Sequence, residues 1–441
     1  MSERYPPGGP RVVVVGAGFG GLAAVQALAR APVAITLIDQ RNHHLFQPLL
    51  YQVATAALSP ADIAGPIRAI LAGQDNVRVV LDIVIGVDRD RCEVLMASGK
   101  RAAYDWLIIA TGARHSYFGR EDWACHAPGI KSIEDATAVR RKVLLALEQA
   151  ETETDPNRRE ALLTFVVIGG GPTGVEMAGA IAELAQRSVN RDFRSITPHC
   201  SKVILINLAP RLLETFPADL SAAALADLER LGVEVRLSTA VEHIAPDHVV
   251  AGGQTIHTHT AIWAAGVEGS PAASWLGAEA DRAGRVKVDG AFHPLGQERI
   301  FVIGDTANCP GSDGLPLPGI APVAKQQGKH AARVIIAELL GRSPPRFRYR
   351  NYGNLATIGR SHAVADLGRV RLRGLWAWLL WSTVHVYFLV GFRNRFVVGL
   401  NLAWNYLTFA RHARLITGEP AGTNPVPSFH LPHGEDYVQA A

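Results

Sequence analysis

The sequence predicts an α/β protein with two similar modules, each a parallel sheet flanked by helices, and a helical segment near the carboxyl end. Three observations predict this class. An apolar, β-branched run at residues 12–15 leads into glycines with G-x-G-x-x-G spacing and then into an Ala/Leu-rich helical stretch. The same order recurs later in the chain. Each copy also has a second apolar run downstream, so that Gly112 lies 96 residues after Gly16 and Gly266 lies 97 residues after Gly169.

The first module carries the parts of a dinucleotide site in register. Gly16 permits the tight turn after the strand, Gly18 lets the backbone approach a pyrophosphate, and Gly21 lets the helix pack on the strand. The helix N-terminus offers free N–H groups to the phosphates. A second strand, 34–38, leads to Asp39, which lies 23 residues past Gly16 and can accept hydrogen bonds from a ribose. We therefore predict a dinucleotide site here.

The second copy repeats this pattern after the apolar run 163–168, with Gly169, Gly171 and Gly174 in the same spacing. We therefore predict two Rossmann-like dinucleotide-binding domains. One is expected to hold a flavin dinucleotide and the other a nicotinamide dinucleotide. The glycines alone do not decide which module holds which.

Composition limits the other functions. A length of 441 residues allows two or three domains with large cores, and a formal net charge of +4 is too small to argue for nucleic acid. The four cysteines lie far apart without a C-x-x-C pair, so we expect a reducing compartment and no metal cluster. The first residues lack the apolar core of a signal peptide. No run of 20 clean apolar residues predicts an ordinary transmembrane helix.

The remaining elements fit this frame. Alternation predicts strands at 77–95, and the pattern predicts a helix at 134–150. Polarity predicts a connector at 151–160. A third apolar strand at 299–305 ends on Asp305, and an acid there can bond the ribityl hydroxyls of a flavin. The helix expected from Pro322 to Leu340 would aim its N-terminus at the flavin ring. The competing interpretation makes Asp305 a cap of that helix.

These residues resemble the two-dinucleotide-domain NAD(P)H oxidoreductases, and within them the type II NADH dehydrogenases, which are single-subunit NADH:quinone oxidoreductases. The resemblance spans about residues 11–416. Its most specific marks are HHLFQPLLYQVATAALSPADIAGPIR (43–68), GGGPTGVEMAG (169–179), YGNLATIGR (352–360) and WSTVHVYFLVGFRNR (381–395).

The resemblance implies that the first module binds FAD, non-covalently, and that the second binds NADH. The FAD contacts it implies are Gly16, Gly18, Phe19, Gly21, Asp39, Thr111, Gly112, Asp305 and Ala324. The nucleotide contacts it implies are Gly169, Gly171, Gly174 and Asn207. The quinone would meet Pro48, Leu49 and Gln326 near the isoalloxazine. The implied domains are FAD-binding at 1–120 and 280–365, NAD(P)H-binding at 121–279, membrane-anchoring helices at 366–416 and a polar tail at 417–441.

The implied reaction is hydride transfer from the nicotinamide to the flavin, followed by reduction of a quinone. Because the cofactors carry this chemistry, few catalytic side chains are expected. Glu176, two residues after Gly174 in the first helical turn, is the catalytic candidate, with a part in proton or substrate handling. The competing interpretation is a carboxylate that interacts only with the helix dipole.

Two departures from the family pattern matter. Asn207 stands where the family usually has a glutamate, so the charge that would repel a 2′-phosphate is missing. Arg211 either pairs with such a phosphate or serves only the loop, so NADPH stays open beside NADH. In the quinone region Pro322 replaces the first glutamine of A-Q-x-A-x-Q, whereas Gln326 keeps the second; its competing interpretation is a solvated helix residue.

Cysteine placement argues against two related chemistries. Residues 40–70 contain no cysteine, so the thiol relay of the disulfide reductases is not expected. A sulfide:quinone oxidoreductase would need redox cysteines, for which Cys125 and Cys309 are the candidates. A scattered cysteine is more often a small core residue.

The carboxyl-terminal region predicts a membrane surface as partner. Between Leu367 and Gly418 there is no Asp or Glu, and the interval holds arginines at 369, 371, 373, 393, 395, 411 and 414. Two apolar stretches, 375–390 and 396–410, lie among them, and the second has polar residues on one helical face at 401, 405, 408 and 412. This pattern is typical of amphipathic helices that lie in a bilayer surface. A buried helical pair or a homodimer interface is the alternative.

We therefore expect a monotopic FAD-containing NAD(P)H:quinone oxidoreductase on the cytoplasmic side of the cell (inner) membrane, without a proton-pumping apparatus. One alternative is a soluble NAD(P)H-dependent reductase of a protein electron carrier. Another is a non-enzymatic redox sensor that binds pyridine nucleotide.

Overall fold

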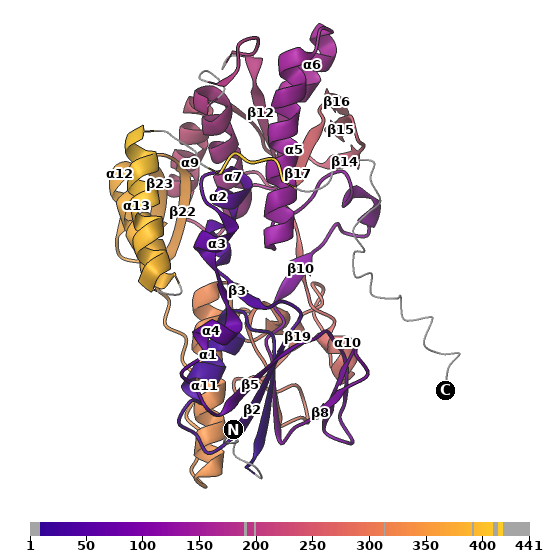
Figure 1. The fold of residues 1–441 in the computed structure, drawn as a ribbon, viewed down its shortest axis with the longest axis vertical. Coiled ribbons are helices and arrows are strands. Elements are labelled where there is room, and N and C mark those ends of the chain that lie inside the picture. The colour runs from indigo at the N-terminus through magenta and orange to yellow at the C-terminus, as the bar shows by residue number, and fades with distance from the viewer. Residues whose placement is uncertain are drawn as a thin grey trace, which may run out of the picture.

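The computed structural model describes residues 9–188, 192–197, 200–312, 314–389, 392–408 and 413–417. Figure 1 shows two lobes stacked along the long axis, with the carboxyl-terminal helices beside the upper lobe. Each lobe is built around one parallel sheet, as the repeated pattern predicts.

The lower lobe contains a five-stranded parallel sheet whose strands come from two distant parts of the chain. Its order is β20 (Ile300–Val302), β9 (Trp106–Ile109), β1 (Arg11–Val15), β2 (Ala34–Asp39) and β5 (Val77–Leu81). Helices α1 (Phe19–Ala27) and α11 (Ala321–Leu339) pack on it. The two helices approach so closely that a side chain on Gly328 would clash with the carbonyl oxygen of Gly20.

The upper lobe contains a four-stranded parallel sheet. Its order is β13 (Val233–Arg236), β12 (Lys202–Ile206), β11 (Thr164–Ile168) and β17 (Thr260–Trp263). Its helices are α5 (Ile133–Thr152), α6 (Pro156–Leu163), α7 (Pro172–Glu183), continued by a π-helical turn at Leu184–Ser188, and α9 (Ala218–Arg230). The predicted polar connector at 151–160 is wrong in part. Asp155 caps α6 by accepting from Asn157 N at 2.9 Å, which starts a helix inside that polar stretch.

A two-stranded antiparallel ribbon joins the lobes. Strand β10 (Ala113–His115) leaves the lower sheet after β9, and β18 (Val267–Gly269) leaves the upper sheet after β17. They pair from Ala113↔Gly269 to His115↔Val267, and Arg114 forms an ion pair with Glu268 at 2.6 Å. The chain therefore crosses between the lobes twice at one place.

Smaller elements complete the lobes. The strand groups are β3 (His43–Leu45) with β4 (Ala64–Pro66); β6 (Val84–Asp88), β7 (Glu93–Met96) and β8 (Arg101–Ala103); β14 (Val241–Ile244), β15 (His248–Ala251) and β16 (Gln254–His257); and β19 (Val286–Lys287) with β21 (Ala307–Asn308). The short helices are α2 (Leu50–Ala54), α3 (Pro60–Ile63), α4 (Ile67–Ile70) and α10 (Ala272–Leu276), with 3-10 turns at Gln47–Leu49, Glu121–Trp123 and Gly304–Thr306.

The carboxyl-terminal part is a small sheet with two helices. Strands β22 (Asn354–Gly359), β23 (His362–Asp366) and β24 (Arg371–Arg373) precede α12 (Gly374–Phe388) and α13 (Phe392–Thr408). The expected helical region at 366–416 therefore begins at Gly374, because the preceding residues pair as the strand β24. Strand β22 lies on α7, where a side chain on Gly179 would clash with the carbonyl oxygen of Ile358.

The lobes have separate apolar cores. The strands β1, β2, β9 and β20 supply one buried cluster, and β11, β12, α5 and α7 supply much of another. In the part of the chain that the structure describes, no helix combines the length and the apolar character needed to cross a bilayer.

Candidate active site

The two glycine turns have the same stereochemistry. Gly16 has φ +97° and Gly169 has φ +114°, a region that side chains rarely adopt. A side chain on Gly21 would clash with the carbonyl oxygen of Gly16, and one on Gly174 would clash with that of Gly169. These four glycines are therefore required by the turns themselves.

The middle glycines differ from the others in both modules. Gly18 and Gly171 are the N-caps of α1 and α7, and a Cβ on either would meet nothing within 4 Å. The protein therefore does not need glycine there for its own packing. Open space in front of a helix N-terminus fits the close approach of a pyrophosphate.

The residues at the ribose positions contact equivalent atoms but differ in chemistry. Asp39 accepts from Ala17 N at 2.6 Å and from Arg41 N at 2.7 Å. Asn207 accepts from Gly170 N at 2.9 Å. Burial raises the pKa of Asp39, against the two backbone N–H groups and the charge of Arg41.

The residues predicted to hold the rest of the FAD lie at the carboxyl edge of the lower sheet. Thr111 Oγ1 is 2.5 Å from Ser270 Oγ, and Ser270 Oγ is 2.7 Å from Thr306 Oγ1, so three hydroxyl groups connect the two lobes. Gly112, at φ +70°, accepts from Ser270 N at 3.3 Å. Ala324, in the first turn of α11, is buried, and its carbonyl oxygen lies close to Gly20.

Asp305 fits a polyhydroxyl ligand. Its side chain forms no hydrogen bond or ion pair within the described residues, although it is largely enclosed. Burial raises its pKa, against the positive charges of Lys131 and Arg285. An enclosed carboxyl group with spare acceptors suits the ribityl hydroxyls predicted from the sequence, so the donor set of this module fits FAD.

Glu176 lies where α7 meets β22. Burial raises its pKa to about 8, against a backbone hydrogen bond from Thr357. A carboxyl group with such a pKa is largely protonated at neutral pH. This environment is more than the helix-dipole interpretation requires, because the dipole at a helix start favours the ionised form.

The residues predicted to meet the quinone are not all exposed to one space. Pro48 is half-buried, whereas Leu49 is fully buried in the core beside α2 and α5. Gln326 Nε2 donates to Arg350 O at 2.9 Å, and Gln326 Oε1 accepts from Arg350 N at 2.9 Å. The amide of Gln326 therefore holds a neighbouring loop.

Sequence reasoning missed an aromatic cluster, defined here as Phe19, His44, Phe46, Tyr51, Trp381 and His385. Phe19 packs edge-on against His44 and Phe46, with centroids 5.2 and 5.8 Å apart. His385 contacts Phe46 at 6.2 Å and stacks on Trp381 at 4.2 Å, and Trp381 contacts Tyr51 at 6.3 Å. The cluster links the first glycine turn to α12.

Sequence reasoning also missed Lys325. Its Nζ lies 5.1 Å from the ring centroid of Phe19 and 4.9 Å from that of Phe388. Burial and the charges of Lys329 and Arg395 lower its pKa, and it forms no ion pair within the described residues. The only sequence signal was its position inside the A-Q-x-A-x-Q pattern.

His44 and Cys309 have structural roles in the described part of the chain. His44 Nδ1 lies 2.8 Å from Ala17 O, and burial lowers the pKa of His44, so this histidine supports the glycine turn. Cys309 is buried in the lower core and burial raises its pKa to about 11, which disfavours a reactive thiolate. Cys125 is exposed.

Helices α12 and α13 expose large apolar side chains. Trp376 is 72% exposed and Trp404 is 54% exposed. The others are Leu375, Leu379, Tyr387, Phe388, Phe396 and Leu400. Arg369, Arg371 and Arg373 are exposed just before α12. The side chains of residues 393, 405, 408, 411 and 412, which belong to the predicted polar and basic face, lie outside the described residues.

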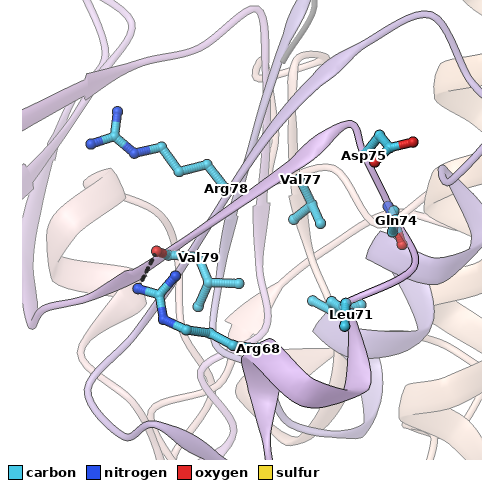
Figure 2. A pocket seen from close by; sticks show the side chains of 8 residues that line it. Arg68, Leu71, Gln74, Asp75, Val77, Arg78 and Val79 are labelled. Atoms are coloured by element: carbon cyan, nitrogen blue, oxygen red, sulfur yellow. Dashed lines mark hydrogen bonds between the residues drawn. The ribbon is translucent and has the colours of Figure 1, made fainter. Parts of the chain in front are cut away.

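A surface groove of about 460 Å³ lies away from this site. Figure 2 shows it between α4 and the edge strand β5, where Arg68 Nη2 donates to Val79 O at 2.9 Å. It is at the amino end of β5, whereas ligands of parallel sheets bind at carboxyl ends. None of the predicted site residues lines it.

Comparisons with known proteins show the family of the chain. A family profile described as pyridine nucleotide-disulphide oxidoreductase matches residues 10–328, and one described as the NDH2 C-terminal domain matches residues 352–412. The type II NADH:quinone oxidoreductase Ndh of Mycobacterium tuberculosis is 42% identical over 94% of this chain and 92% of that protein. NdhA of the same organism is 44% identical over 92% of this chain and 88% of that protein.

Solved structures agree in fold. NDH2 from Plasmodium falciparum in complex with NADH matches with a TM-score of 0.84 at 20% identity, covering 93% of this chain and all of that chain. The sulfide:quinone oxidoreductase of Aquifex aeolicus matches with a TM-score of 0.70 at 20% identity, covering 89% of this chain and 92% of that chain. By its sequence and its fold, this chain belongs to the type II NADH:quinone oxidoreductases of the pyridine nucleotide-disulphide oxidoreductase family.

Proposed function

We propose that this protein oxidises NADH at its upper module and reduces a quinone, with FAD held by the lower module. The observation that carries the proposal is the ribbon of β10 and β18, which joins the carboxyl edges of the two sheets. Parallel sheets bind their ligands at these edges. The hydroxyl of Thr111 at one edge is bonded to that of Ser270 beyond the other, so the ribbon holds the two cofactor edges together.

When bound, FAD accepts a hydride from NADH and passes two electrons to the quinone. The protein binds and orients the reactants. The N–H groups at the start of α1 would hold the pyrophosphate, Asp39 would bind the ribose, and Asp305 would accept from the ribityl hydroxyls. The corresponding turn at Gly169–Gly174 would hold the nicotinamide nucleotide.

Glu176 holds a proton in this site. Reduction of a quinone to a quinol takes up protons as well as electrons. A carboxyl group with a pKa of about 8 can give up a proton as negative charge develops nearby and can regain one from solvent at neutral pH. Its place at the start of α7 puts it beside the nucleotide site.

We propose that the quinone head group binds at the aromatic cluster. Trp381 Nε1 and Gln52 Oε1 are buried without a hydrogen-bond partner in the described residues, and Gln52 Nε2 donates to Tyr51 OH at 2.9 Å. An unpartnered indole N–H suits a quinone carbonyl oxygen. Lys325, which forms no ion pair within the described residues, would stabilise negative charge on a reduced oxygen.

We propose that the exposed face of α12 and α13 lies on lipid, on the cytoplasmic side of the cell membrane. Its tryptophans and the neighbouring arginines have the chemistry of an interfacial anchor. A quinone dissolved in the bilayer would then enter beside α12, which carries Trp381 and His385.

The test of the activity is anaerobic addition of NADH to the purified flavoprotein, followed by a soluble quinone analogue. Loss of the oxidised-flavin absorbance on NADH and its return on quinone are expected. If NADH leaves the absorbance unchanged, the nucleotide assignment is wrong. Absorbance that is lost and does not return contradicts the quinone assignment.

The lipid assignment has a separate test, flotation with vesicles that contain anionic phospholipid. The wild-type protein is expected to float with the vesicles, and the double variant Trp376→Ser/Trp404→Ser is expected to float less. Leu295→Ser is the matched control, because Leu295 is fully exposed in the lower lobe, away from α12. Equal flotation of all three proteins contradicts the assignment.

A further inference from the structure

The loop after β12 is closed by its own side chains. Asn207 Nδ2 donates to Ala209 O at 3.2 Å and to Arg211 O at 3.0 Å, while Asn207 Oδ1 accepts from Gly170 N. An amide nitrogen has two N–H groups, and both are used here. The side chain is thus fixed with only acceptor capacity left for a ribose hydroxyl.

This arrangement requires an amide rather than a carboxylate. The atom that faces the carbonyl oxygens of Ala209 and Arg211 must be a donor, whereas a carboxylate has only acceptors. Gly170 completes the fit, because a side chain there would clash with Asn207 and with Leu212. The first module has Ala17 and Asp39 at the equivalent positions. The loss of the acid and the shape of this loop therefore belong together.

Arg211 is also committed to the loop. Its Nη1 donates to Phe216 O at 3.0 Å and its Nη2 to Glu214 O at 2.7 Å. These contacts hold the guanidinium on the backbone that follows it. These bonds use two of its five N–H donors and hold the side chain to the loop, which favours the loop role over a dedicated 2′-phosphate contact, the two interpretations from the sequence.

We propose that the second module accepts NADPH as well as NADH, and that it discriminates weakly because the residue at its ribose position is neutral. This inference rests on the proposed function, since it concerns the same nucleotide site. A carboxylate at this position excludes NADPH by repelling the 2′-phosphate and by binding both ribose hydroxyls. Asn207 removes the repulsion, and Arg211 adds no dedicated phosphate contact.

The first test uses the wild-type protein. We expect the values of kcat/KM for NADH and NADPH, with a quinone acceptor, to differ by less than about tenfold, which corresponds to a small free-energy difference. The calorimetric Kd values for NAD⁺ and NADP⁺ with the oxidised protein are also expected to differ by less than about tenfold. A larger preference for NADH, or for NADPH, overturns the inference. Failure of both nucleotides would instead overturn the proposed function.

Two variants separate a neutral site from an arginine clamp. Asn207→Asp is expected to raise the ratio of the NADPH Kd to the NADH Kd by about tenfold or more. The reason is that the substitution restores a negative charge near the phosphate. Arg211→Gln loosens the loop and is expected to weaken both nucleotides alike, leaving the ratio unchanged. A selective loss of NADP⁺ binding in Arg211→Gln would show a clamp and refute the proposal. Because each ratio compares two ligands on one protein, a globally unfolded fraction of a variant does not alter it.

Discussion

The two modules share one backbone device and use it for different tasks. In each, a strand ends in a glycine at positive φ, a second glycine leaves open space at the helix start, and a third lets the helix approach. They differ at the strand end, which carries Asp39 in the first module and Asn207 in the second. They also differ in the helix, where buried Ala23 occupies the position equivalent to Glu176. The comparison leads us to expect that the glycines supply phosphate binding alone. We expect specificity and proton chemistry to come from the few residues that differ.

Their coverings differ too. Helix α1 is covered by α11, whose first turn carries Ala324 and Lys325, whereas α7 is covered by β22. The strand encloses Glu176 and raises its pKa. The same helix position can therefore be inert in one module and titratable in the other.

The largest effects are expected from breaking one glycine turn at a time. Gly21→Ala should yield protein without flavin, while Gly174→Ala should keep the flavin and lose NADH-dependent reduction by at least about a hundredfold, because each added Cβ meets a carbonyl oxygen. The flavin-to-protein absorbance ratio and stopped-flow reduction measure the two outcomes. Loss of flavin from folded Gly174→Ala would mean that the modules are not separate cofactor sites.

Removing the titratable group comes next. Glu176→Gln should lower turnover about tenfold to a hundredfold with FAD still bound, and it should remove the decline in rate that we expect of the wild-type as pH rises through about 8. A pH–rate profile at saturating NADH gives the result. Identical profiles for the two proteins would leave Glu176 without a catalytic part.

The same variant has a stability signature. The folded protein holds the Glu176 proton up to about pH 8, while the unfolded chain releases it near the ordinary value of 4.5, so this group lowers the free energy of unfolding as pH rises between them. Glu176→Gln should therefore have a higher Tm than the wild-type at pH 8, and a smaller difference at pH 5.

Exchanging the ribose residue sharpens the comparison further. Asp39→Asn makes the first module resemble the second. The two oxygens of Asp39 each accept one backbone N–H group, and an asparagine has a single oxygen, so one of these N–H groups would lose its acceptor. We expect the Kd of FAD to rise about tenfold, measured by titration of the flavin-depleted protein. An unchanged Kd would show that the charge at this strand end is dispensable in both modules.

The smallest effect is expected at Lys325. Lys325→Met keeps the alkyl contact with Phe19 and Phe388 but removes the charge, so reoxidation of the flavin by quinone should slow about threefold. Reduction by NADH should stay at the wild-type rate. Arg333→Met, at an exposed position further along the same helix, is the control. An equal effect on both half-reactions would count against a role at the quinone end.

The local parts of the fold were predictable from the sequence. The strands at 12–15 and 163–168, the glycine turns, and the long helices α5 and α11 follow from short-range patterns. Helix α6 was missed because a polar stretch with an aspartate cap looks like a connector. The small sheet β22–β24 was missed in part because its last strand lies in a basic stretch that was assigned to helices.

The site was predictable at the strand ends, where Asp39 and Asp305 follow apolar runs. It was not predictable where distant segments meet. Gln326 binds the backbone of Arg350, Leu49 packs into the core, and Lys325 lies between two aromatic rings from opposite ends of the chain. Such contacts depend on the assembled fold, and no periodicity encodes them.

The ribbon of β10 and β18 has a further consequence. Ser116 N donates to Gly266 O at 3.2 Å, beside the pairing of β10 with β18. The segment that forms the upper sheet therefore begins and ends at two hydrogen-bonded strands. The nucleotide module is therefore an insertion whose two ends lie together. A homologous segment with the same two end strands and the same contact between α7 and β22 could be exchanged without cutting the lower sheet, which would transfer the nucleotide preference.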